Sequence, residues 1–161
     1  MNSLITSLAR VLTDPGTDPR RLDGPFAGLL AQLQSLLLLA ARLYLAQVFW
    51  LSGLTKLRDW SSTLALFQDI YQVPLLPPVP AAYLGTAGEL LLPVLLVAGL
   101  GGRFAAAGLF VVNLMAALSL SADDFSPAAQ AQHTLWGVLA LVLAVWGAGR
   151  WSIDAWRARR R

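Results

Sequence analysis

Two ionisable residues, Arg42 and Glu89, lie inside long apolar stretches of this 161-residue chain. A charged side chain at membrane depth costs at least a few kcal/mol unless it is paired or hydrated, so such residues mark a candidate functional site. Gln47 and Asn113 are polar residues inside the same kind of stretch. Counting about 1.5 Å per residue along a helix, all four lie about 10 to 16 Å from one face of the membrane. We therefore expect an Arg42–Glu89 ion pair, with Gln47 and Asn113 completing its hydrogen bonds.

Three functions for this polar layer are compatible with the sequence. The pair could serve only to hold the first two helices together, as polar groups often do between membrane helices. It could also bind a small ligand such as a quinone headgroup, or form part of a path for protons or ions. Spacing alone does not decide among these three functions.

A second polar group is expected near the other face of the membrane. Lys56 ends the first apolar stretch, His133 begins the last one, and Asp123 and Asp124 lie shortly before His133. A histidine at that edge could protonate a quinone, or it could be a hydrogen-bonded interface residue. One histidine, two adjacent aspartates and zero cysteines form no recognisable metal motif, so we predict no metal site.

Four apolar stretches must position these residues. The chain is 57% hydrophobic and only 13% charged, whereas an average globular domain has about 25% charged residues. Each stretch is about as long as the roughly 30 Å hydrocarbon layer of a bilayer. The four stretches are Ser35–Leu54, Ala81–Leu100, Phe104–Leu120 and Thr134–Gly149.

The sequence therefore predicts an all-α fold, a bundle of four transmembrane helices. Residues 35–154 form the membrane domain, residues 1–34 a cytoplasmic N-terminal segment and linker, and residues 155–161 a basic cytoplasmic tail. The N-terminus is either a short amphipathic helix on the inner membrane surface or a partly ordered tail, since apolar residues recur there at helical spacing: Leu4, Ile5, Leu8, Val11 and Leu12.

The connection between the first two stretches has two halves. Trp60, Leu64, Phe67 and Tyr71 lie about one helical turn apart, which predicts an interfacial helix that Asp59 or Ser61 could cap. The second half contains four prolines and cannot be helical throughout: Pro74, Pro77, Pro78 and Pro80. This half is either an extended lid over a site or a stiff spacer.

The distribution of basic residues predicts the orientation in the membrane. With four spans, both termini and the turn at Arg103 lie on one side, which holds nine of the twelve Lys and Arg residues. The positive-inside rule places that side in the cytoplasm of a bacterial inner-membrane protein. Anionic lipid headgroups explain the arginine-rich tail, and no nucleic-acid-reading module accompanies the charge. The predicted partners are thus the lipid bilayer and no nucleic acid.

Several of these residues fall in motifs that resemble the DoxX family. The resemblance runs from Arg42 to Asp154 and includes SGLTKL at Ser52–Leu57, Glu89 in ELLLPVLLVAGLGGR, and GAGRWSID at Gly147–Asp154. It implies a four-helix membrane fold with these motif positions: Arg42, Ser52, Gly53, Lys56, Glu89, Arg103, Gly149, Arg150, Ser152 and Asp154. Within the closing motif we expect Asp154 to meet Arg150 and Arg103 in a cytoplasmic cap.

The resemblance implies a redox-associated function. The family is named after small subunits of an archaeal thiosulfate:quinone oxidoreductase, and its bacterial relatives are associated with redox or oxidative-stress partners. We therefore expect a quinone-linked membrane subunit that acts with a partner protein or as a homo-oligomer, with quinone as the candidate cofactor. The candidate ligand-site residues are Arg42, Gln47, Lys56, Glu89, Asn113 and His133.

An alternative function stays open because distant eukaryotic relatives resemble cargo receptors and receptor-assembly chaperones that catalyse nothing. The chain would then be a non-enzymatic scaffold, chaperone or small-ligand-binding membrane protein. The sequence does not decide whether the chain is an enzyme or a non-catalytic subunit of a quinone-dependent oxidoreductase.

Overall fold

A computed structural model describes residues 25–120 and 126–160 of the chain. The predicted N-terminal amphipathic helix, Asp123, Asp124 and Arg161 lie outside the described residues. The described residues form helices and no strands: α2 (Pro25–Arg58), α3 (Trp60–Asp69), α4 (Pro78–Ala98), α5 (Gly102–Ser119), α6 (Pro127–Trp146) and α7 (Ile153–Ala158).

Four of these helices, α2, α4, α5 and α6, are long and apolar enough to cross a membrane. The predicted all-α bundle of four membrane-spanning helices is therefore confirmed. All four helices begin earlier than the predicted stretches, and the difference is largest for α2, which begins at Pro25, and α6, which begins at Pro127. In α6 the Ser126 hydroxyl accepts the Ala129 N–H and Pro127 occupies the first turn. The following turns, AAQAQH, are too polar for hydropathy to reveal them although they suit a helix.

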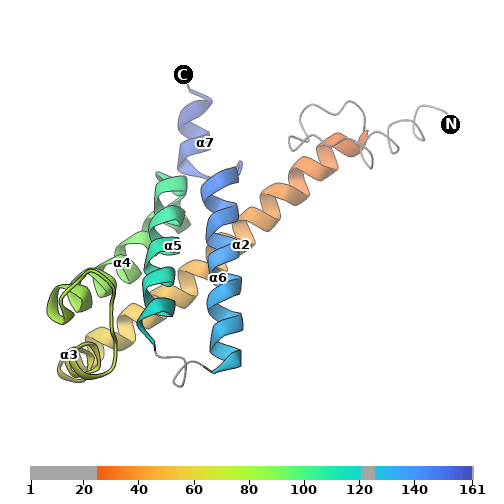
Figure 1. Cartoon of the computed structure of the whole chain (residues 1–161). Coiled ribbons are helices and arrows are strands. Elements are labelled where there is room, and N and C mark those ends of the chain that lie inside the picture. The colour runs from red at the N-terminus through yellow and green to blue at the C-terminus, as the bar shows by residue number, and fades with distance from the viewer. Residues whose placement is uncertain (1–24, 121–125, 161) are drawn as a thin grey trace.

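The spans pack in the order α2, α4, α5, α6, and α2 also contacts α6. Figure 1 shows α5 and α6 side by side, while α2 crosses the other helices obliquely and its N-terminal part extends to their right. Leucines from all four spans form the centre of the core: Leu45, Leu96, Leu109 and Leu143. We call the two ends of the bundle the α7 end and the α3 end.

At the α7 end, the closing motif docks on the turn between α4 and α5. The Asp154 carboxylate accepts the N–H groups of Gly101 at 3.1 Å and Gly102 at 2.9 Å, where α5 begins. The Asp154 N–H donates to the Gly99 carbonyl oxygen at 3.0 Å. Asp154 therefore caps the N-terminus of α5, where a negative charge is favourable.

The expected meeting of Asp154 with Arg150 and Arg103 is wrong. Among the described residues, neither arginine forms an ion pair with Asp154. The physical reason lies in the start of α7, where the Ser152 hydroxyl accepts the Ala155 N–H and fixes the first turn. Asp154 in that turn is aimed at the unpaired N–H groups of α5, which compete successfully with exposed arginines.

At the α3 end, α3 folds back across the bundle as a capped helix. The Asp59 carboxylate accepts the Ser62 N–H at 2.9 Å and the hydroxyls of Ser62 and Ser61, and these bonds lower the pKa of Asp59 to about 2. Phe67 of α3 packs on Ala81 and Ala82 of α4. The predicted helix after Asp59 is confirmed, although it ends at Asp69 and leaves Tyr71 in the following segment.

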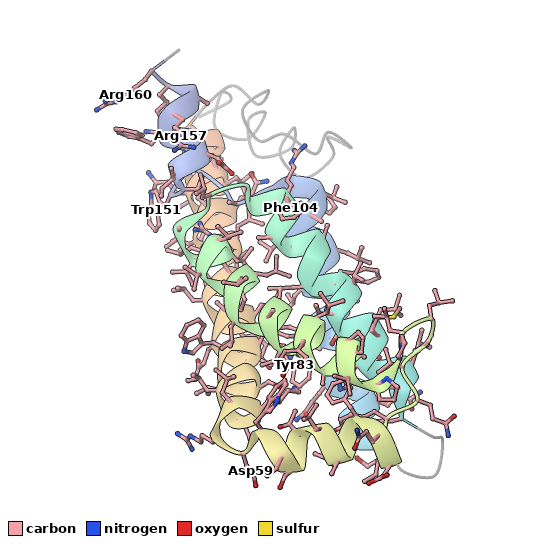
Figure 2. All side chains as sticks on the ribbon, turned by 90° about the vertical axis from the view of Figure 1, so that its left-hand side faces the viewer. Asp59, Tyr83, Phe104, Trp151, Arg157 and Arg160 are labelled. Atoms are coloured by element: carbon pink, nitrogen blue, oxygen red, sulfur yellow. The ribbon has the colours of Figure 1, made fainter. Side chains whose placement is uncertain are left out.

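The two ends differ in charge. Figure 2 shows Arg157 and Arg160 at one end of the molecule and Asp59 at the other.

We predict that a single cysteine introduced by Arg157→Cys reacts only from the cytoplasm and one introduced by Gln68→Cys in α3 only from outside, because the basic end should remain inside. The chain has no native cysteine, so labelling of intact cells with a membrane-impermeant maleimide reports each site alone. If the impermeant reagent labelled position 157 but not position 68 in intact cells, the α7 end would lie outside and the predicted orientation would be wrong.

Candidate ligand-binding site

An ion pair between Lys56 of α2 and Glu89 of α4 forms the polar centre of the α3 end. The Lys56 Nζ lies 2.6 Å from one Glu89 carboxylate oxygen, 2.8 Å from the other and 3.0 Å from the Ser52 hydroxyl. The side chains of Lys56 and Glu89 are 21% and 8% exposed. Ser52 and Lys56 are four residues apart, so they share one face of α2.

Gly53 allows the two helices to approach closely enough for this pair. A Cβ atom at Gly53 would lie 2.8 Å from the Leu90 side chain and 3.2 Å from the Glu89 Cβ. Any larger residue would therefore displace α4 from α2 at the level of the ion pair. This explains the SGxxK spacing physically, because Gly53 sets the contact that Ser52 and Lys56 use.

The predicted Arg42–Glu89 pair is wrong. Arg42 is only 1% exposed, and its guanidinium donates to four backbone carbonyl oxygens: Nε to Leu96 at 2.8 Å, Nη1 to Ala148 and Trp151 at 2.8 Å each, and Nη2 to Val97. Leu96 and Val97 belong to the last turn of α4, where carbonyl oxygens attract a cation, although the Leu96 carbonyl also accepts the Gly99 N–H at 3.1 Å. Arg42 therefore turns toward the α7 end, away from Glu89.

Gly99 brings Arg42 and the closing motif together. Its backbone has φ +64°, and a Cβ atom there would lie 2.8 Å from the Arg42 Nη2 and 2.4 Å from the Ser152 Cβ. The Ser152 hydroxyl in turn donates to the Gly149 carbonyl oxygen at 2.7 Å. Arg42, Gly149, Ser152 and Asp154 thus form one structural unit at the α7 end and do not line the cavity described below. Arg103 and Arg150 are exposed at the same end.

Asn113 holds His133 between α5 and α6. The Asn113 Nδ2 donates to the His133 carbonyl oxygen at 2.8 Å, and the Asn113 Oδ1 lies 2.9 Å from the His133 Nδ1. Because the amide oxygen is an acceptor, the Nδ1 atom donates in this contact. The His133 ring also packs edge-on against Trp136, with 5.0 Å between ring centroids. The expected contribution of Asn113 to an Arg42–Glu89 network is therefore wrong.

A cavity of about 470 Å³ joins the ion pair to the histidine. Its wall is mostly apolar and includes the aromatic residues Phe49, Phe67, Tyr71 and Trp136, while Ser52, Lys56, Glu89, Ser119 and His133 supply polar groups. The volume lies within the range of about 300–1,000 Å³ for small-molecule sites. Such a site can hold an apolar ring or chain while one polar group of the ligand meets the ion pair.

The cavity contains three of the six predicted ligand-site residues: Lys56, Glu89 and His133. Asn113 supports His133 from behind, Arg42 lies at the α7 end, and Gln47 is exposed on a different face of α2. Sequence reasoning did not assign Tyr71, Ser119 or Trp136 to a site. Ser52 was placed among structural residues, although its position one turn before Lys56 was a signal that it shares the site.

The segment after α3 closes one side of the cavity. Tyr71, Val73 and Leu76 line it, and the Gln72 N–H donates to the Ser119 carbonyl oxygen at 2.9 Å. The segment between α3 and α4 therefore lines the site, whether it acts as a lid or as a stiff spacer. Among the described residues, no three His, Asp or Glu side chains are grouped to hold a metal ion.

Removing one member of the ion pair should destabilise the protein. Glu89→Leu or Lys56→Met should each lower the free energy of unfolding by about 3 kcal/mol, because the remaining charge is stranded, and the double variant should recover most of the loss. Thermal unfolding of the purified protein in mild detergent measures these effects. Arg58→Met, which removes an exposed cation two residues from Lys56, is the matched control and should change little. Single variants that melt like this control would contradict the prediction.

Replacement of Arg42 should destabilise the protein. Arg42→Met removes the guanidinium donor from four carbonyl oxygens, two of them in buried contacts, and should cost about 3 kcal/mol. Arg42→Lys should be intermediate, because an ammonium group has three donors and lacks the planar shape of a guanidinium. The same unfolding measurement applies, with exposed Arg150→Met as control. Equal melting of Arg42→Met and Arg150→Met would show that the four hydrogen bonds contribute nothing.

The comparisons with known proteins agree with the motifs. The family model described as DoxX matches residues 37–122, more than half of the chain. The match includes Arg42, Ser52, Gly53, Lys56, Glu89 and Arg103, and it ends before the closing motif. No curated protein and no solved structure gave a match. The chain is a multi-pass membrane protein and belongs to the DoxX family.

Proposed function

We propose that this protein binds the headgroup of a quinone in the cavity between Lys56, Glu89 and His133, as a redox-associated membrane subunit that acts with a partner protein. The observation that carries the proposal is a buried ion pair at one end of an otherwise apolar, aromatic cavity. A quinone headgroup combines a flat ring with polar oxygens, which is the combination that such a cavity accepts. When bound, it would supply two-electron, two-proton chemistry.

The ion pair can bond with a ligand in two ways. The Lys56 Nζ lies 2.6 and 2.8 Å from the two Glu89 oxygens and 3.0 Å from the Ser52 hydroxyl. The two oxygens of one carboxylate lie in nearly the same direction from Nζ, so one N–H group serves both and another N–H group remains for a ligand carbonyl oxygen. The Glu89 carboxylate has about four lone-pair positions and keeps some of them for an O–H donor. The pair can therefore bond with a carbonyl oxygen of the oxidised form or with an O–H group of the reduced form.

The position of the cavity supports exchange with the membrane. It lies among helices that cross the bilayer and under the segment of Tyr71 and Val73. His133, held by Asn113, presents a titratable ring at the same cavity. A proton could thus be taken up or released at this end of the site. We propose the bacterial inner membrane, with the α7 end in the cytoplasm, as the setting.

The experiment is to purify the protein in mild detergent and measure quinone per protein after extraction. Ala116→Phe introduces a ring into the cavity from α5, a helix that carries neither member of the ion pair, so it should lower the bound quinone at least tenfold. Leu118→Phe on the exposed face of the same helix is the matched control and should retain the quinone. If the parent binds neither copurified nor added quinone, the proposal fails and the scaffold alternative gains support. Equal retention by both variants would place any bound quinone elsewhere.

A further inference from the structure

A groove of about 540 Å³ lies between α2 and α4 and shares no lining residue with the cavity. Leu43, Gln47 and Trp50 of α2 form one wall, and Pro93 and Val94 of α4 contribute to the other. The lining is almost entirely apolar, and the exposed residue Gln47 borders it. Leu43 is 48% exposed and Trp50 is 39% exposed. The groove is thus an open face of two membrane-spanning helices.

Gln47 has no hydrogen-bond partner on this face. Its side chain is exposed and bonds with no residue in the described part of the chain. It lies beside Pro93 and Val94, which are about 6 to 8 Å from the end of α4 at about 1.5 Å per residue. At that depth lipid tails offer neither donors nor acceptors, so a primary amide needs a partner from another polypeptide.

We propose that this face is the interface of a homodimer, in which the Gln47 amides of two copies bond with each other. An amide has both donors and an acceptor, so it complements itself. Two copies in one membrane share one orientation, and a two-fold axis along the membrane normal therefore brings equal depths together. Gln47 would meet Gln47, a pairing that Lys56 or Arg42 could not make with themselves because of like charge.

The shape of the face also suits a second copy. Leu43 and Trp50 project on either side of Gln47, one helical turn away in each direction, and the hollow beside them is bordered by Pro93 and Val94. A side chain from one copy can enter the hollow of the other, and the two-fold axis repeats the contact. Polar side chains between membrane helices are a known source of association.

Cross-linking in native membranes tests the proposal, since the chain has no native cysteine. Under mild oxidation, Leu43→Cys should give a disulfide-linked dimer of twice the 17.3 kDa chain mass. Leu141→Cys on α6 is the matched control, because it is 45% exposed and five residues from the α7 end of its helix, at a depth similar to Pro93. The control should give little cross-linking.

The amide is tested by adding Gln47→Leu. This substitution should weaken association about 3- to 30-fold, the range expected for one polar pair between membrane helices. Dilution in detergent followed by light scattering measures the change. Equal cross-linking at positions 43 and 141, or undiminished dimerisation of Gln47→Leu, would overturn the proposal. A cross-linked product of another mass would assign the face to a different membrane protein, and a monomer with bound lipid would assign it to lipid.

Discussion

The guanidinium of Arg42 is the contact on which the α7 end depends. It starts on α2 and bonds with the last carbonyls of α4 and with Ala148 and Trp151 after α6. A buried carbonyl left without a donor costs free energy, and Arg42 supplies a donor to each of these four, of which Leu96 also accepts the Gly99 N–H. Asp154 adds α5 to the same unit by capping its first N–H groups. Arg42 of α2 and Asp154 of α7 thus connect α4, α5 and the segment after α6, mainly through hydrogen bonds with backbone groups.

The α3 end is built differently, and the difference leaves space for a site. There the polar contacts join helices in pairs, Lys56 with Glu89 and Asn113 with His133, and no described residue binds all four helices. The cavity lies between these two pairs. The α7 end is thus held together by many hydrogen bonds, and the α3 end by fewer. The bundle can therefore contain a cavity at the α3 end while the α7 end keeps the helices packed together.

Hydropathy predicted the four spans, since it depends on the residues alone. The partners of the charged residues could not be predicted in the same way. Counting residues placed Arg42 and Glu89 in one layer, but rotation and tilt of α2 decide which face each residue meets, and neither is encoded in a spacing. Arg42 and Lys56 both lie on α2, but only Lys56 pairs with Glu89. Gly53 lets the part of α2 near Lys56 pack closely against α4. The unpaired carbonyls that attract Arg42 belong to every helix end and have no sequence signature.

Helix α4 connects the two surfaces that we propose. Glu89 faces the cavity and Pro93, four residues later, borders the groove. A proline has no N–H, so the Glu89 carbonyl oxygen lacks its usual helical donor, and α4 lacks one hydrogen bond in the turn between the two surfaces. Proline at such a turn permits a bend. The carboxylate that holds the ion pair therefore lies at a turn of α4 that lacks one helical hydrogen bond, while the ends of that helix are fixed by Arg42 and by packing under α3.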